Sequence, residues 1–300
     1  MKNESTRAAA PRKDQSGTRG GNAPAKKKYY RRPHRLTLGV RVFIALMCAL
    51  LAFLLAVVVA YYFGYRYICI EREDGELVRF VGRVDATGTP YAGRLYYSSG
   101  IKAKINTAAG RIEYSNGATY SGDLVDFYRD GVGTLTLKNG DEYTGEFKGD
   151  VITGRGVYKF SGGDVYEGDF IAGVKEGMGK YTYANGDVYE GGFLGDLRHG
   201  EGVMSWSDGS KYEGSFVFGL KSGKGSYTYS NGDTYVGDFE DDMRQGEGTY
   251  TWAESGESYT GGFYKNNMHG YGTYTWPDGR ASYSGYFENG KIVAVAPSGS

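Results

Sequence analysis

The sequence predicts an all-β body of tandem hairpins that follows one apolar helix near the N-terminus. Three observations support this prediction: a 23-residue repeat of Tyr, Gly and Phe, Asn-Gly steps between alternating segments, and one long run without charge. The 300 residues include 50 Gly, 29 Tyr and 14 Phe but only 6 Pro, so the composition is neither collagen-like nor that of a Pro/Gly-rich disordered chain. Short strands joined by many tight turns fit these numbers.

The apolar run covers residues 42–63 and contains 22 consecutive uncharged residues. As a helix it extends roughly 33 Å, enough to cross a bilayer core. Every face of the run is apolar, which excludes a core helix with a single apolar stripe. Val58-Val59-Ala60 is typical of a signal-peptidase site, but the run is longer than the roughly 7–15 apolar residues of a signal peptide. We therefore expect a retained transmembrane helix.

Charge predicts how this helix is oriented. Residues 1–41 carry 12 Lys and Arg against Glu4 and Asp14, whereas the remainder carries 23 against 33 Asp and Glu. The positive-inside rule then places the N-terminus in the cytoplasm and the repeats outside it, in a single-pass protein of the cell membrane. Residues 1–41 are expected to be a disordered basic tail, with Lys26 to Arg41 able to contact anionic lipid. The mildly acidic body disfavours nucleic acid as a partner.

The repeat is visible by inspection. The element Tyr-x-Gly-x-Phe/Leu begins every 23 residues from Tyr120, and the last two intervals are 24. Seven residues after each of the first seven Phe or Leu comes a Gly-x-Gly pair, and an alternating segment and a turn such as Asn185-Gly186-Asp187 follow it. Asn-Gly between alternating runs is a strong hairpin signal. Both extra residues fall at these tips, which are expected to tolerate insertion because nothing stacks on them.

The period of two along a strand predicts one aromatic face. Tyr250 and Trp252 point to the same side, as do Tyr259, Gly261 and Phe263 on the returning strand. Glycine at the centre of the element leaves space for a ring to lie flat on the backbone. Because one two-stranded hairpin is marginal in water, each unit depends on its neighbours. The aromatic face is the expected binding surface. Its residues are Tyr181, Tyr183, Tyr189, Trp206, Tyr212, Tyr227, Tyr229, Tyr235, Tyr250, Trp252, Tyr259, Tyr274 and Trp276.

From Tyr120 to about Gly290 the chain resembles the MORN (membrane occupation and recognition nexus) repeat proteins. Asp187 to Phe193 and Arg198 to Gly202 match the pattern closely. The resemblance implies an elongated, single-layer, twisted antiparallel sheet with a grooved aromatic face that contacts proteins or lipids, and it implies no catalytic residues. Degenerate copies precede the array. The expected organisation is a tail at 1–41, a transmembrane helix at 42–63, a juxtamembrane β region at 64–119, the repeat array at 120–290 and a flexible tail at 291–300.

The repeat pattern explains the presence of the other residues that could take part in catalysis or in binding a phosphate or a metal. His199 and His269 occupy equivalent repeat positions, where a surface residue is expected, and catalysis would require an oriented partner. The segment 219–226 lacks the spacing of a phosphate loop. Asp164, Asp187 and Asp233 suit turns and lack an EF-hand pattern, although weak calcium binding stays open. We expect no catalytic, cofactor-binding or metal residues.

Two functions fit this sequence. The first is a membrane-anchored, non-catalytic scaffold whose aromatic surface contacts a protein or a membrane-surface partner, including lipid head groups. The alternative is an extracytoplasmic protein that binds glycans or cell-wall polymers, because rows of Tyr and Trp can stack on sugar rings. Cys48 lies within the apolar run as a small filler, whereas Cys69 could join two copies through a disulfide.

Overall fold

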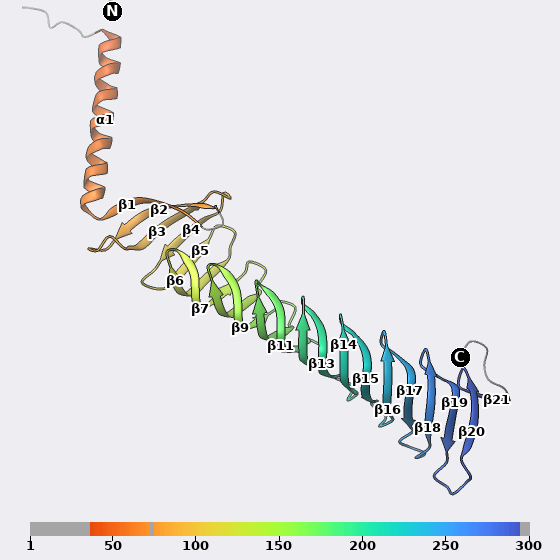
Figure 1. Cartoon of the computed structure of the whole chain (residues 1–300). Helices are drawn as coiled ribbons and strands as arrows, with labels where there is room; N and C mark the ends of the chain where they lie inside the picture. The colour runs from red at the N-terminus through yellow and green to blue at the C-terminus, as the bar shows by residue number, and fades with distance from the viewer. Residues whose placement is uncertain (1–36, 73–74, 295–300) are drawn as a thin grey trace, which may run out of the picture. The chain divides into compact units, whose positions relative to one another are not determined.

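The computed structural model describes residues 37–72 and 75–294 and shows one helix followed by the strands of one sheet (Figure 1). The chain divides after Leu55 into two units, and the second contains all the described strands. The expected basic tail lies outside the described residues up to residue 36. In the expected C-terminal tail at 291–300, residues Lys291–Val293 form a strand, and residues 295–300 lie outside the described residues.

The described elements alternate strand and turn after a single helix. They are α1 (Leu38–Tyr62), β1 (Tyr65–Glu71), β2 (Leu77–Val84), β3 (Pro90–Tyr97), β4 (Lys102–Asn106), β5 (Arg111–Tyr114), β6 (Thr119–Val125), β7 (Tyr128–Thr136), β8 (Glu142–Lys148), β9 (Val151–Lys159), β10 (Val165–Ile171), β11 (Val174–Thr182), β12 (Val188–Leu194), β13 (Leu197–Ser205), β14 (Lys211–Val217), β15 (Leu220–Thr228), β16 (Thr234–Glu240), β17 (Met243–Thr251), β18 (Ser258–Tyr264), β19 (Asn267–Thr275), β20 (Tyr283–Glu288) and β21 (Lys291–Val293).

α1 has 25 residues and is long and apolar enough to cross a membrane, a property that a signal sequence near the N-terminus would share. The helix begins at Leu38, before the apolar run, and includes Arg41, whose amide donates to the Thr37 carbonyl at 3.1 Å. The helix can extend beyond the apolar residues because its hydrogen bonds join backbone groups, whatever the polarity of the side chains.

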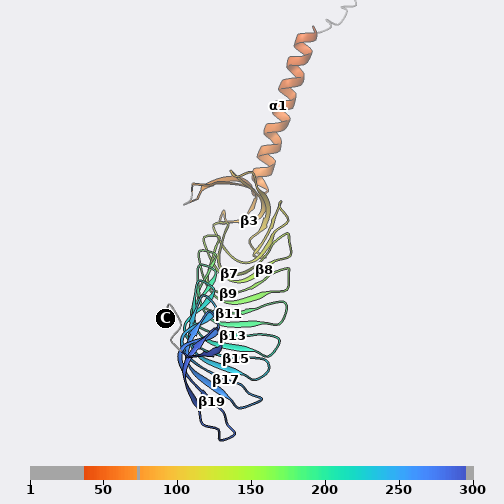
Figure 2. The same cartoon turned by 90° about the vertical axis from the view of Figure 1, so that its right-hand side faces the viewer.

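Every strand from β2 to β20 pairs antiparallel with the strand before it and the strand after it, so strand order follows chain order. Successive hairpins stand side by side along one open sheet (Figure 2). This confirms the predicted fold class, an all-β body of antiparallel hairpins with one N-terminal helix.

The segment that joins one unit to the next is itself a tight turn. Between β10 and β11 it consists of Ala172 and Gly173, with φ of 51° and 82°. Left-handed φ at both central residues is typical of the two-residue hairpin turn whose twist matches that of the strands. The register shifts between Gly168 and Phe170, which places a bulge beside this turn. The fixed length found in the sequence therefore has a local cause, because an added residue would change both the turn and the bulge.

The expectation that nothing stacks on the hairpin tips was wrong. Asp164 at one tip accepts a hydrogen bond from the Ala184 amide of the next tip at 2.8 Å, and Asp187 accepts one from Ser207 at the same distance. Each tip therefore holds the following tip in place. In the longer tip before β18, Glu257 accepts the hydroxyl of Tyr274 at 2.8 Å, so the added residue is accommodated by a longer acidic side chain.

The N-terminal strands share the core of the repeats. Phe80 on β2 and Leu95 on β3 have no exposed surface. Phe127, in the turn between β6 and β7, lies against Phe80 with ring centroids 5.1 Å apart and planes at 19°. Phe127 has a φ of 69°, a backbone conformation that residues other than glycine seldom adopt. Packing against Phe80 stabilises that conformation and connects the first strands to the repeats.

Candidate binding surface

The first tyrosine is buried in each of the seven repeats that begin at Tyr120 to Tyr259. The ring of Tyr166 covers Gly168 and Gly179, where a Cβ on Gly179 would lie 2.5 Å from its Cε2 atom. Its hydroxyl donates to the Asp169 carbonyl at the bulge, at 3.0 Å. The ring also meets Phe170 edge-on at 5.1 Å. Burial raises the pKa of Tyr166 to about 12.

Four residues of the expected binding surface belong to this buried set, so the prediction was wrong for them. Tyr189, Tyr212, Tyr235 and Tyr259 have no exposed surface. Each occupies the Tyr166 position of its repeat, with the ring over two glycines and the hydroxyl bonded to a bulge carbonyl. These four rings pack between repeats and present nothing to a partner.

The other nine expected rings are half-buried and stand together, and we call them the aromatic row. They are Tyr181, Tyr183, Trp206, Tyr227, Tyr229, Tyr250, Trp252, Tyr274 and Trp276. Consecutive rings from Trp206 to Trp276 have centroids 4.4 to 5.8 Å apart and planes tilted by 34° to 57°. From Trp206 to Trp276 the row thus crosses several repeats with each ring in contact with the next.

Two further rings extend the row and were missing from the expected surface. Tyr158 and Phe160 have centroids 4.5 Å apart, and Phe160 lies 6.0 Å from Tyr181. Both are half-buried. They stand 23 residues before Tyr181 and Tyr183, so the repeat spacing could have identified them.

A second line of side chains, one per repeat, brings positive charge beside the rings. Lys175, Arg198, Lys221 and Arg244 follow one another at intervals of 23 residues. The Lys221 ammonium lies 5.0 Å from the ring centre of Tyr227, and the Arg244 guanidinium lies at the same distance from that of Tyr250. Such contacts attract a cation to the ring face. Burial lowers the pKa of Lys221, and the neighbouring Asp242 opposes that change.

Hydrogen bonds at the tips orient the rings of the row. Tyr181 donates to Asp164 at 2.6 Å, and Tyr250 donates to Asp233 at 2.7 Å. The same carboxylates bind the amide of the next tip, and these hydrogen bonds lower the pKa of Asp164 and Asp233. These two rings are therefore held in one orientation before any partner arrives, which reduces the entropy lost on binding.

The other residues considered as possible catalytic or binding groups are His199, the segment 219–226 and the two cysteines. Nδ1 of His199 accepts the Phe218 amide at 3.5 Å, and its ring stands 5.2 Å from that of Phe218. The segment 219–226 begins in a turn and continues into β15. Among residues 37–72 and 75–294, no group of three or more His, Cys, Asp or Glu is placed to hold a metal ion. Cys48 and Cys69 are both unpaired and exposed.

Comparison with solved structures gave distant likenesses. The TCP domain of SAS-4 (dCPAP) from Drosophila melanogaster, in complex with a proline-rich motif of Ana2, is 16% identical with a TM-score of 0.34, and the match covers 56% of this chain and 94% of that chain. A mutant TCP10 domain of Danio rerio CPAP is 13% identical with a TM-score of 0.25, covering 75% and 96%. Scores this low support no argument about function.

Comparison with known families gave a direct match. The family described as MORN repeat matches residues 120–142, 143–165, 166–188, 189–211, 212–234, 235–256 and 259–279. These seven matches together span more than half of the 300 residues. No curated protein matches the chain. The matched segments contain the aromatic row, the buried tyrosines and the line of cations.

Proposed function

This chain belongs to the MORN repeat family, and from that premise we propose that it is a non-catalytic, membrane-anchored interaction protein whose aromatic row holds a protein partner. The row carries the proposal, because its half-buried rings from Trp206 to Trp276 contact one another in sequence, and carboxylates at the tips hold Tyr181 and Tyr250 in place. Tyr and Trp dominate binding hot spots, since they bring large contact area at a low entropic cost.

The shape of the surface favours an extended partner segment. Neighbouring strands lie about 4.8 Å apart, so each repeat of two strands advances the row by roughly 10 Å. A segment that follows the row would meet one or two rings per repeat, with one cation per repeat from Lys175 to Arg244. Repeat proteins commonly use such continuous surfaces for long partners. Carbonyl or carboxylate groups of the segment would suit Lys221 and Arg244.

The titratable groups near the row support a non-catalytic role. Asp164 is engaged by Tyr181 and the Ala184 amide, and Asp196 by the amide and ammonium of Lys175. Groups with such structural partners are poorly suited to act as a general acid or base, which needs a free position for the substrate proton.

The anchor belongs to the same proposal. α1 would cross the cell membrane once, with the basic N-terminal flank in the cytoplasm and the repeats outside it. Protease protection of the repeats in intact cells tests this orientation, because repeats outside the membrane would be digested without lysis.

Cys69 is exposed on β1, where it could link two copies through a disulfide, and non-reducing electrophoresis tests that dimer.

Photo-crosslinking in cells tests the row. A photoreactive residue at position 252 should capture one specific protein, and Tyr229→Ala with Trp252→Ala should lower its recovery by at least about tenfold if these rings are hot spots. The matched control is Tyr271→Ala with Tyr286→Ala, which removes an exposed aromatic pair from the opposite face of the sheet. Equal recovery from both double variants would contradict the proposal.

A glycan partner is the second candidate. The indole of Trp252 lies between the rings of Tyr250 and Tyr274, and such rings could stack on sugars of a cell-wall polymer. The tilt between neighbouring rings favours a protein over a flat polysaccharide chain. Binding of wall polysaccharide by the unaltered protein, lost in the same double variant, would support the glycan instead.

A further inference from the structure

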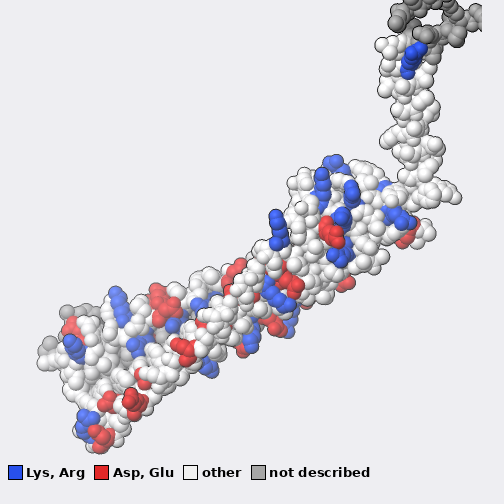
Figure 3. Space-filling model, turned by 180° about the vertical axis from the view of Figure 1, so that it is seen from behind, with Lys and Arg blue, Asp and Glu red and all other residues white. Residues whose placement is uncertain are grey.

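The N-terminal strands expose a basic face on the side away from the core. Six cations occupy it: Arg79, Arg83, Arg94, Lys102, Lys104 and Arg111. Alternation along the strands explains the placement, because Phe80 and Leu95 point into the core and their neighbours point outward. On the side drawn in Figure 3, basic side chains gather over these strands, whereas both signs mix along the repeats.

Pairing of the strands places cations next to one another. Arg94 on β3 stands directly opposite Lys104 on β4, and Tyr96 separates Arg79 from Lys102 across three strands. Like charges directly opposite each other destabilise an antiparallel pair. The requirements of folding therefore do not explain this arrangement, and an anionic ligand would.

Acidic side chains on this face neutralise only part of its charge. Glu113 lies 3.8 Å from Lys104 and 3.3 Å from Arg111. Among the described residues, no carboxylate lies within 4.0 Å of the side-chain nitrogens of Arg79, Arg83, Arg94 or Lys102. Residues 120–300, by contrast, carry 15 Lys and Arg against 27 Asp and Glu. The positive charge is thus specific to this end of the sheet.

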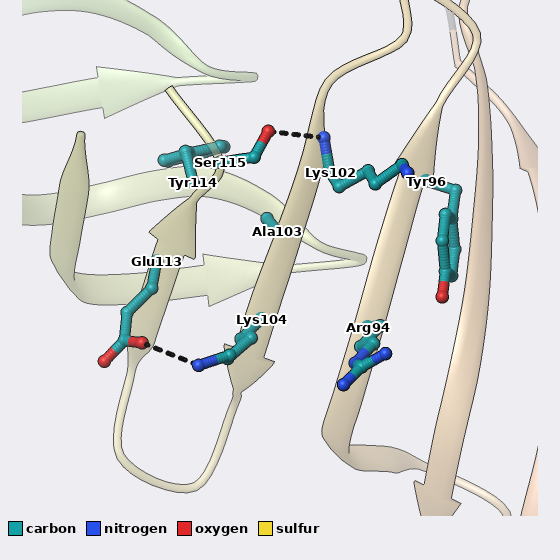
Figure 4. Close-up of a pocket in the computed structure, with 8 residues that line it drawn as sticks. All are labelled: Arg94, Tyr96, Lys102, Ala103, Lys104, Glu113, Tyr114 and Ser115. Carbon is teal, nitrogen blue, oxygen red and sulfur yellow. Dashed lines mark hydrogen bonds and ion pairs between the residues drawn. The ribbon is translucent and has the colours of Figure 1, made fainter. Parts of the chain in front are cut away.

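Three of the six cations line a hollow. It has a volume of about 400 Å³ and is lined by Arg94, Tyr96, Lys102, Lys104 and Glu113, among others. Figure 4 shows Arg94 on β3 and the two lysines on β4 around it, with Lys104 joined to Glu113. A head group with a phosphate and hydroxyls could enter this hollow and contact guanidinium and ammonium groups together.

The same face carries exposed apolar and aromatic side chains. Tyr65 and Tyr67 on β1 are 49% and 65% exposed, and Val81 beside Tyr67 is also exposed. β1 begins three residues after α1 ends, so the chain between them spans at most about 10 Å. Tyrosine is enriched where a protein meets the polar layer of a membrane.

We propose that the basic face binds the anionic phospholipid head groups of the membrane that α1 crosses. The inference rests on the membrane-spanning role of α1 and is independent of the partner of the aromatic row. Charge complementarity selects an anion, and the short tether with the two exposed tyrosines selects a lipid over a soluble anion. Such a contact would hold the first strands at the membrane surface.

Cys69 provides a probe of this contact, because it is exposed and stands opposite Arg79. Full-length protein with Cys48→Ala has Cys69 as its sole thiol. The protein is placed in nanodiscs of phosphatidylcholine alone or mixed with phosphatidylglycerol, and the labelling rate with a neutral water-soluble maleimide is measured. We expect labelling to be at least about fivefold slower in the anionic discs, with the difference abolished by high salt.

Substitutions locate the effect. Arg94→Gln, Lys102→Gln and Lys104→Gln together should restore the rate found in phosphatidylcholine. Lys138→Gln, Lys265→Gln and Lys291→Gln remove the same charge from the repeats and the last strand, and they should leave protection intact. All six side chains are exposed, so both triple variants are expected to fold.

Several outcomes would overturn the inference. Equal labelling rates in the two discs would do so, as would protection that survives the triple substitution of the basic face. Equal protection by inorganic phosphate in phosphatidylcholine discs would identify a soluble anion as the ligand. A chain that fails to co-elute with either disc would contradict the membrane anchor as well, whereas co-elution without lipid-dependent protection would contradict this inference alone.

Discussion

The ring of Phe193 stands edge-on to that of Tyr166 in the preceding repeat, with centroids 5.0 Å apart and planes at 81°. Phe193 meets Tyr189 of its own repeat in the same way, at 5.2 Å and 84°. Edge-to-face pairs at such distances are favourable beyond the area that they bury. One phenylalanine per repeat therefore joins two units, and the coupling recurs from Tyr120–Phe147 to Tyr259–Phe287.

Loss of this ring should weaken the array at one place. Phe193→Ala is expected to destabilise the surrounding hairpins by about 3–5 kcal/mol, because it removes a buried ring and leaves a cavity. Hydrogen exchange should speed up first in β11 to β13. Ile171→Ala, at an exposed position, is the control and should change exchange little. Uniform acceleration along all strands would contradict the local coupling.

The glycines that lie beneath the buried tyrosine rings can be tested by adding one methyl group. Gly179→Ala would place its Cβ 2.5 Å from Cε2 and from the hydroxyl of Tyr166, so the ring must move. We expect a loss of about 1–3 kcal/mol, typical of overpacking. Gly162→Ala has open space around the new Cβ and should be close to neutral. Urea denaturation of the two variants would measure the difference. Similar midpoints would show that the ring of Tyr166 does not require glycine at position 179.

Alkaline pH should unfold the repeats. Burial raises the pKa of Tyr166, Tyr189, Tyr212 and Tyr259 to about 12, above the ordinary value of 10.0. Because the folded pKa is the higher one, the stabilisation is complete below pH 10 and is lost as pH rises from 10 to 12. Circular dichroism and tyrosinate absorbance should report one shared transition in that window.

A single-site variant checks the origin of this transition. Tyr189→Phe removes one buried hydroxyl and should make the pH dependence between 10 and 12 shallower. Tyr271→Phe, on the exposed opposite face, serves as the control. An identical alkaline profile for Tyr189→Phe and the unaltered protein would show that other groups cause the unfolding.

Asp150 connects the N-terminal strands with the repeats through two arginines. Its Oδ1 atom accepts the amide and Nε of Arg129, both at 2.9 Å, and the carboxylate also pairs with Arg72. The two arginine side chains are only 17% and 8% exposed. Asp150→Asn should cost about 3 kcal/mol, because it leaves the largely buried Arg129 guanidinium without its counter-charge and leaves Arg72 paired with Glu76 alone.

The backbone cannot account for such a loss. Asp150 has a φ of 71°, and asparagine adopts that conformation at least as readily as aspartate. Asp126→Asn is the matched control, since Asp126 occupies the equivalent turn at a φ of 48° and is exposed. Thermal unfolding should show a lower midpoint for Asp150→Asn alone. Equal midpoints would mean that the charge of Asp150 is dispensable.

The strands, their turns and the aromatic face could be predicted from the spacing of a few residue types. Asn-Gly steps and alternation reflect local backbone preferences, which are determined by residues adjacent in the chain. The contact between tips could not be predicted, because Asp164 and Ala184 meet only when two hairpins stand in register.

Tyr166 and Tyr181 differ in burial, although the sequence pattern does not distinguish them. They share one face and stand directly opposite each other on paired strands, so the pattern of alternation treats them alike. Tyr166 is fully buried, whereas Tyr181 remains half-exposed in the row. The difference arises because a ring can be seated only where two glycines on adjacent strands coincide, and strand pairing brings Gly168 opposite Gly179. The 23-residue period was sufficient to establish a sheet of aromatic hairpins. Which rings form its core and which remain accessible depended on the register between strands, a property of the folded chain.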